Sequence, residues 1–166
     1  MNEIDSLKDS NGCLDFDSIK KVIPYDKPFI FVDKILNLEK GSIVGIKKIR
    51  ADEEFFKGHF VDFQIMPGAL MIEGLGQTAT LLIRYNLLNH QEKDILAYKI
   101  KEASFTSPVF PGMEIRYEAN LIAYDEREAV INGKIYSGNH LIANASFIVA
   151  IVDKNEFRKK VHLQSR

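Results

Sequence analysis

The sequence predicts a single α+β domain in which an antiparallel sheet of about six strands wraps around one long central helix. Two observations lead to this prediction. Short β-branched segments punctuated by turn residues occur on both sides of one apolar stretch, and that stretch is too long to be a strand. The chain has 166 residues, of which 46% are hydrophobic, so it can enclose one full core and is too short for two ordinary domains.

The N-terminal part is predicted to hold a short helix and two strands. Residues 1–15 are polar and are expected to form a loose segment. A helical pattern follows over Asp17–Ile23, opening on a capping residue and stopping before a proline. The segments Phe29–Leu36 and Ser42–Ile49 are short and β-branched, and residues 39–41 between them are typical of a hairpin turn.

A long buried helix is predicted from Gly68 to Asn89. Its apolar residues occur on nearly every side, so the helix must be surrounded by protein. Glu73, Gln77, Thr80 and Arg84 recur every three or four positions and therefore form one polar line, which we expect to face a channel or an interface. A sheet of this size covers only part of such a helix, so a second copy of the chain is the simplest cover for the rest.

The second half of the chain, Ile95–Val152, is predicted to complete the sheet. Apolar and polar residues alternate over Met113–Leu121, which is typical of a half-buried strand. Two further strands are predicted around residues 129–136 and 141–152, joined by a turn at residues 137–139.

Composition excludes several classes of protein. With 22 basic and 23 acidic side chains the formal charge is −1, so no overall field attracts nucleic acid. The single cysteine, Cys13, excludes an internal disulfide and fits a reducing compartment. No signal-peptide pattern or membrane-length apolar run is present, and we expect a cytoplasmic protein. The domain is expected to span residues 16–153, followed by a basic tail at 154–166.

A histidine and a glutamate in the segment GHFVDFQIMPGALMIEGLGQ, residues 58–77, are the best candidates for chemistry. His59 lies among turn-forming residues, whereas Glu73 lies in the predicted buried helix, where an unpaired carboxylate is costly. Each residue also has a structural interpretation. His59 would then close a loop through hydrogen bonds, and Glu73 would form an ion pair, for example with Arg84 of a second copy.

Three blocks of sequence resemble the FabZ-type hot-dog dehydratases of bacterial fatty-acid synthesis. They are IPYDKPFIFVDKI (residues 23–35), the segment at residues 58–77 and FTSPVFPGMEI (residues 105–115). The resemblance implies a hot-dog fold and conversion of (3R)-3-hydroxyacyl-acyl carrier protein to the trans-2-enoyl form, with no metal or organic cofactor. It also implies a homodimer with shared active sites, which assembles further into a hexamer as a trimer of dimers.

By this resemblance His59 matches the catalytic histidine, Glu73 the catalytic carboxylate, and Gly68 the glycine whose backbone N–H binds the thioester carbonyl. Removal of water from a 3-hydroxyacyl thioester needs a base at C2 and an acid at the C3 hydroxyl, which an imidazole and a buried carboxyl supply. Gln77 belongs to the same motif and is expected to bind substrate near the site. The residues expected to set the depth of the acyl tunnel are Phe63, Leu96, Tyr98 and Phe110.

The chain departs from the family pattern at several positions. Val61 and Asp62 follow GHF where the family usually has a proline-glycine turn, and Tyr25 follows Ile-Pro where it often has histidine. Two other functions therefore stay open. One is thioester hydrolysis, with Glu73 activating water, and the other is a non-catalytic module that binds acyl thioesters.

Basic side chains near strand ends offer a dock for an acidic carrier protein. Solvated strand edges explain the same residues equally well. The residues of this dock are Lys47, Lys48, Arg50, Lys99 and Lys101.

Overall fold

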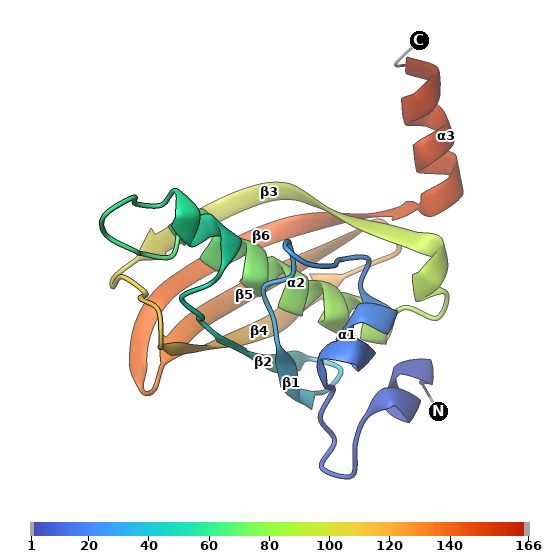
Figure 1. Ribbon diagram of the computed structural model, residues 1–166. Helices are drawn as coiled ribbons and strands as arrows, with labels where there is room; N and C mark the ends of the chain where they lie inside the picture. Colours follow the sequence, from blue (N-terminus) through green and yellow to red (C-terminus); the bar gives the residue numbers. More distant parts are fainter. Residues whose placement is uncertain (1, 165–166) are drawn as a thin grey trace.

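The computed structural model describes residues 2–164 and has the α+β architecture that the sequence predicts (Figure 1). The elements, with η denoting 3-10 helices, are η1 (Glu3–Leu7), α1 (Phe16–Val22), β1 (Lys34–Leu38), β2 (Ser42–Lys48), η2 (Glu54–Lys57), α2 (Gly68–Asn86), η3 (His90–Glu92), β3 (Lys93–Phe105), β4 (Glu114–Tyr124), β5 (Glu128–Ser137), β6 (His140–Asp153) and α3 (Lys154–Gln164).

The six strands form one antiparallel sheet in the order β1-β2-β4-β5-β6-β3. The sheet curves around α2, which contacts β2, β3, β4 and β5 (Figure 1). After β2 the chain runs along α2 and enters β3, at the far edge of the sheet, before returning to β4 beside β2. The segment that carries the candidate residues is therefore the connection that crosses the inner face of the sheet.

Two glycines allow α2 to lie directly against the sheet. A Cβ atom at Gly74 would overlap the hydroxyl of Tyr117 on β4. A Cβ atom at Gly133 on β5 would lie 2.6 Å from Cδ1 of Leu75, closer than packed carbons approach. Leu75 and Tyr117 are both fully buried, so this contact is the centre of the core.

Three element boundaries differ from the sequence prediction. The strand predicted over Phe29–Leu36 begins only at Lys34, because the backbone at Phe29 and Phe31 bonds to the side chain of Gln77 and not to a neighbouring strand. Helix α1 begins after Asp15, whose carboxylate accepts from the N–H of Ser18 and caps the helix two residues earlier than predicted. Helix α2 ends at Asn86, three residues short of the predicted end.

The N-terminal segment expected to be loose is folded from residue 2 onward. Ile4 and Leu14 are 1% and 0% exposed, and Leu14 pairs with Ile35 of β1. The hydroxyl of Tyr85, at the end of α2, donates to Asp5 at 2.9 Å. The prediction of a loose segment was wrong because two apolar side chains, spaced among polar ones, are buried and hold the segment against the core.

The basic C-terminal segment forms a helix as far as residue 164. Asp153 caps α3 by accepting from the N–H groups of Asn155 and Glu156, and Arg158 pairs with Asp94 through bonds of 2.9 and 3.1 Å. Helix α3 extends away from the sheet (Figure 1). Within the described residues, no helix is long and apolar enough to cross a membrane.

Tyr117 provides a test of this packing. Its hydroxyl is buried and has no hydrogen-bond partner among residues 2–164. Tyr117→Phe removes an unpaired polar group, so we expect the free energy of unfolding to be unchanged or to rise by up to about 1 kcal/mol. The matched control is Tyr85→Phe, which breaks the bond to Asp5 and should lower the free energy of unfolding by about 1 kcal/mol. Urea unfolding of both variants measures the difference, and clear destabilisation by Tyr117→Phe would contradict it.

Candidate active site

The N-terminus of α2 presents a free backbone donor. Pro67 caps the helix without a side-chain bond, and its carbonyl accepts from the N–H groups of Leu70 and Met71 at 3.0 and 3.2 Å. No group among residues 2–164 accepts from the N–H of Gly68. The Phe105 ring lies so close that a Cβ atom on Gly68 would be 2.8 Å from it. A free N–H at the positive end of a long helix is suited to bind a carbonyl oxygen that gains negative charge.

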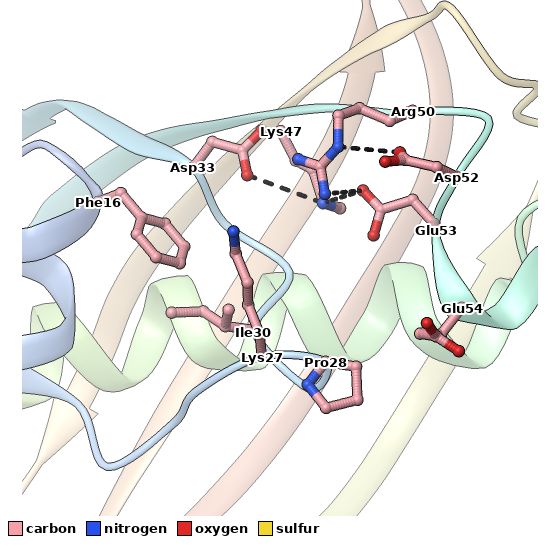
Figure 2. Close-up of a pocket in the computed structure, with 10 residues that line it drawn as sticks. All are labelled: Phe16, Lys27, Pro28, Ile30, Asp33, Lys47, Arg50, Asp52, Glu53 and Glu54. Atoms are coloured by element: carbon pink, nitrogen blue, oxygen red, sulfur yellow. Dashed lines mark hydrogen bonds and ion pairs between the residues drawn. The ribbon is translucent and has the colours of Figure 1, made fainter.

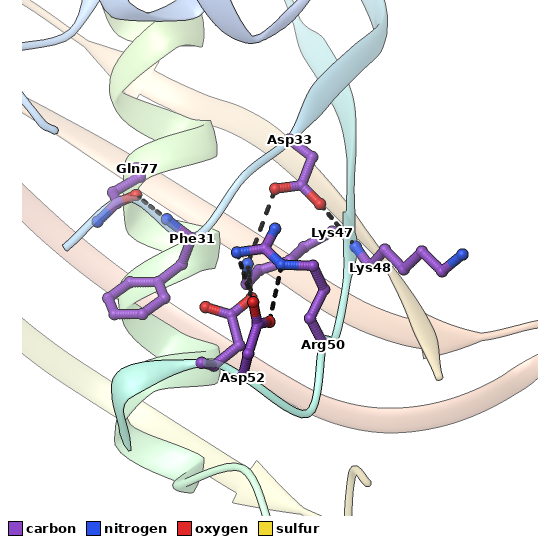
Figure 3. Close-up of polar contacts among 8 residues, drawn as sticks. Phe31, Asp33, Lys47, Lys48, Arg50, Asp52 and Gln77 are labelled. Atoms are coloured by element: carbon purple, nitrogen blue, oxygen red, sulfur yellow. Dashed lines mark hydrogen bonds and ion pairs between the residues drawn. The ribbon is translucent and has the colours of Figure 1, made fainter. Parts of the chain in front are cut away.

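Gln77 holds the carboxyl group of Glu73 in place. The amide oxygen of Gln77 accepts from the N–H of Phe31 at 2.8 Å (Figure 3), so its Nε2 must face the other way. That Nε2 donates to the carbonyl of Phe29 at 3.0 Å and to Oε1 of Glu73 at 2.9 Å. Since Oε1 accepts this bond, a proton on the carboxyl group belongs on Oε2. Gln77 is fully buried, and its bond fixes one oxygen of the Glu73 carboxyl group, whereas a direct contact of Gln77 with substrate stays a prediction.

Glu73 lies in the wall of an apolar cavity of about 360 Å³ between α2 and strands β3 and β6. Such a cavity is of the size that binds small apolar ligands. The residues that line it are Tyr25, Ala69, Ile72, Glu73, Gly76, Thr80, Ile95, Ala97, Ile100, Ala103, Phe105, Phe147 and Val149.

His59 lies on the loop between η2 and α2, joined to Phe60 by a cis peptide bond. Its Nδ1 is 2.9 Å from the carbonyl oxygen of Ile65. A carbonyl only accepts, so Nδ1 carries the hydrogen and a neutral ring has its free lone pair on Nε2. The hydrogen bond that would merely close a loop thus also prepares a base. Within one chain His59 does not line the cavity that contains Glu73.

A buried ion cluster fixes the start of the loop that carries His59 (Figure 3). Lys47, near the end of β2, is 1% exposed, and its Nζ lies 2.7 Å from Glu53 and 3.7 Å from Asp33. Arg50 lies 3.6 Å from the same oxygen of Glu53. Glu53 directly precedes η2, so the cluster ties the base of this loop to the sheet.

The same ion cluster borders a second hollow of about 550 Å³, lined also by Phe16, Lys27 and Pro28 (Figure 2). This hollow is larger than the cavity at Glu73 but contains neither Glu73 nor His59. The ion cluster also corrects the prediction that Lys47 belongs to a dock for the carrier protein. Lys47 is buried and paired, so it cannot meet a partner protein.

The four residues expected to line the acyl tunnel do not line the cavity of their own chain. Phe63 lies on the loop that carries His59, where its carbonyl accepts from the N–H of Phe60, and its ring packs edge to face against Phe110 at 5.7 Å. Leu96 and Tyr98 are exposed on β3, whose alternate residues line the cavity instead. Successive side chains of a strand face opposite sides, so Leu96 and Tyr98 face away from the cavity of their own chain, and their place in an acyl tunnel stays a prediction.

The polar line predicted along α2 does not face one channel. Glu73 and Thr80 line the cavity, but Gln77 and Arg84 are buried. Arg84 donates to the carbonyls of His90 and Lys93 in the connection after α2. Burial lowers the pKa of Arg84. Arg84 therefore stabilises the end of the helix and is not free to pair with Glu73 of a second copy.

The fold and this site define a hot-dog protein with an apolar cavity along its central helix. Three solved structures share the fold, each at 14% identity. They are the dehydratase heterocomplex ApeI:P of Xenorhabdus doucetiae (TM-score 0.73, covering 86% of this chain and 96% of that one), a hot-dog-like protein of Thermanaerovibrio acidaminovorans (0.63, 74% and 89%) and the fluoroacetyl-CoA thioesterase FlK (0.65, 76% and 97%). At this identity they show the fold alone.

Sequence comparison shows the family. A family model described as a FabA-like domain matches residues 23–150. The 3-hydroxyacyl-(acyl-carrier-protein) dehydratase FabZ of Solibacter usitatus is 35% identical over 143 residues, which cover 86% of this chain and 88% of that protein. FabZ of Sulfurovum sp. is 37% identical over 142 residues, with 82% and 95% covered. The chain belongs to the FabZ family of dehydratases.

Proposed function

We propose that this protein is a 3-hydroxyacyl-acyl carrier protein dehydratase, a hydro-lyase of fatty-acid synthesis that acts in the cytoplasm. It converts a (3R)-3-hydroxyacyl chain on acyl carrier protein to the trans-2-enoyl chain. The observation that carries this proposal is the Glu73 carboxyl, held by Gln77 at 2.9 Å in the wall of an apolar cavity. An apolar wall accommodates the acyl chain, and one fixed oxygen leaves the other free to act on it.

Each step of the reaction has a group suited to it. The N–H of Gly68 binds the thioester carbonyl oxygen, on which negative charge develops when C2 loses its proton. Nε2 of His59 takes that proton as the base. Oε2 of Glu73 gives its proton to the C3 hydroxyl, the C3–O bond breaks, and water leaves as the C2–C3 double bond forms. His59 then holds one extra proton and Glu73 has lost one, so transfer between them or through solvent restores the site.

The active site is completed by a second copy of the chain, which supplies His59 to the cavity that contains Glu73. Two observations support a homodimer. His59 is absent from the cavity of its own chain, and the edge strand β3 exposes large apolar side chains. These exposed residues are Leu96, Tyr98, Ile100 and Phe105. Further assembly of three dimers into a hexamer is part of this proposal.

Mixing two inactive variants tests the shared site. His59→Ala and Glu73→Gln should each lose most dehydration alone. In a mixed dimer one site carries both changes and the other carries neither, so unfolding and refolding the two together should restore a substantial fraction of activity. The matched control mixes each variant with itself. If His59 and Glu73 act within one chain, no mixture regains activity and the dimer proposal is wrong.

The assay also separates the alternative functions. Dehydration produces an enoyl thioester, detected by its absorbance and by the loss of one water mass from the acyl carrier. Thioester hydrolysis, the alternative that the fold shares with FlK, would instead release free thiol without an enoyl product. A binding module would retain the acyl carrier and form neither product, and either of these two results would contradict the proposed reaction.

A further inference from the structure

The cavity at Glu73 contains a polar group that the proposed reaction does not use. Apart from Glu73, only Tyr25 and Thr80 among its lining residues carry polar side-chain atoms. The Thr80 hydroxyl donates to the carbonyl of Gly76 at 2.9 Å and is therefore paired. The hydroxyl of Tyr25 has no hydrogen-bond partner among residues 2–164. An unpaired donor thus opens onto an otherwise apolar wall.

Tyr25 lies toward the C-terminal half of α2. The segment that follows it crosses α2 at Gln77, which binds the backbone of Phe29 and Phe31. Burial raises the pKa of Tyr25, the Glu73 carboxylate raises it further and Arg84 lowers it. The hydroxyl is therefore neutral, and it shares the cavity wall with Gly76 and Thr80, which lie beyond Glu73 as seen from Gly68.

This position is reached by the far part of an acyl chain, an inference that rests on the proposed function. The thioester carbonyl is placed at Gly68 and C3 at Glu73, so the chain beyond C3 continues along α2. Gly76 and Thr80 lie on the same face of the helix as Glu73, and Thr80 is roughly 10 Å farther along the axis. The chain that fills this stretch ends against Tyr25.

We propose that Tyr25 is a specificity-determining residue that makes the cavity prefer short 3-hydroxyacyl chains over long saturated ones. A short chain stops before Tyr25 and leaves its hydroxyl in contact with water. A long saturated chain covers the hydroxyl with CH₂ groups, which offer no hydrogen bond in exchange for the water that they displace. The preference arises from an unpaired donor, so no side chain has to block the tunnel.

The test compares two chain lengths in two matched variants of the whole protein. We measure kcat/KM for dehydration of 3-hydroxybutyryl and 3-hydroxylauroyl carrier protein. Tyr25→Phe keeps the ring and removes the unpaired hydroxyl, so the ratio of long-chain to short-chain kcat/KM should rise about tenfold. Thr80→Val removes a paired hydroxyl from the same cavity and should leave this ratio unchanged.

Two results overturn the proposal. In one, Tyr25→Phe leaves the ratio unchanged or lowers kcat/KM equally for both lengths, as expected if a second subunit pairs the hydroxyl. In the other, Thr80→Val raises the ratio as much as Tyr25→Phe does. Failure of the proposed function would look different, because the wild-type protein would then dehydrate neither substrate. In that case calorimetric binding of butyryl and lauroyl pantetheine to the same variants still measures the preference for chain length.

Discussion

Glu73→Gln is expected to lower kcat for dehydration by about 100- to 10,000-fold while the protein stays folded. The amide has nearly the shape of the carboxyl group, and its oxygen can still accept from Nε2 of Gln77, 2.9 Å away in the wild type. It cannot give a proton to the C3 hydroxyl, so the acid step loses its catalyst. The enoyl absorbance assay at saturating substrate measures kcat, and a thermal melt checks the fold.

A second glutamate provides the control for this substitution. Glu102 is exposed on β3 and lies outside the cavity, so Glu102→Gln makes the same substitution at a distance from the reacting atoms. We expect its kcat to stay within about twofold of the wild type, since surface substitutions of this kind perturb proteins little. Full activity in Glu73→Gln would show that the acid is another group, and an equal loss in both variants would show that the effect is not specific.

The parts of the structure that the sequence predicts are those set by local pattern. Helix α2 follows from an apolar run that a glycine opens after Pro67, and it begins at Gly68 as predicted. Strand β4 follows from alternation, and its inward residues Ile115, Tyr117 and Ala119 are buried. In both elements the backbone bonds to its own helix or to an adjacent strand, so nearby residues determine the result.

The parts that the sequence did not predict depend on distant partners. The backbone at Phe29 and Phe31 bonds to Gln77, 46 or more residues away, so β-branched composition predicted a strand where none forms. The local sequence does not reveal the hydrogen bonds of Gln77 for the same reason. The polar spacing that put Arg84 beside Glu73 on one line is a property of an isolated helix, whereas Arg84 bonds to the connection that follows α2.

The lining of the cavity was the hardest part to predict. The pairing of β3 with β6 shifts register between Ala97 and Lys99 and again between Ile100 and Glu102. Each irregularity reverses which side chains face the helix, so strict alternation from either end of the strand fails. In the sequence Tyr25 stands out only as a departure from a family pattern, because nothing in the local sequence of the segment between α1 and β1 places it beside Glu73.

Lys47→Met is expected to lower the free energy of unfolding by about 3–5 kcal/mol, the cost of removing one partner from a buried ion pair. Lys47 and Glu53 have side chains that are 2% and 10% exposed, and their charged atoms are 2.7 Å apart. Methionine fills a similar volume but leaves the Glu53 carboxylate with only Arg50, at 3.6 Å. Because Glu53 precedes the loop that carries His59, kcat should also fall. Urea unfolding and the enoyl assay measure the two effects.

A lysine at the end of η2, next to the same loop, separates the effect of burial from that of charge. Lys57 pairs with Glu54 at 2.8 Å, but their side chains are 72% and 60% exposed, so Lys57→Met should cost less than about 1 kcal/mol. If the loss in Lys47→Met comes from an isolated buried carboxylate, then adding Glu53→Gln should recover part of the stability and the kcat. Equal destabilisation by Lys57→Met, or a double variant that is less stable than Lys47→Met alone, would show that the ion cluster does not hold the His59 loop in this way.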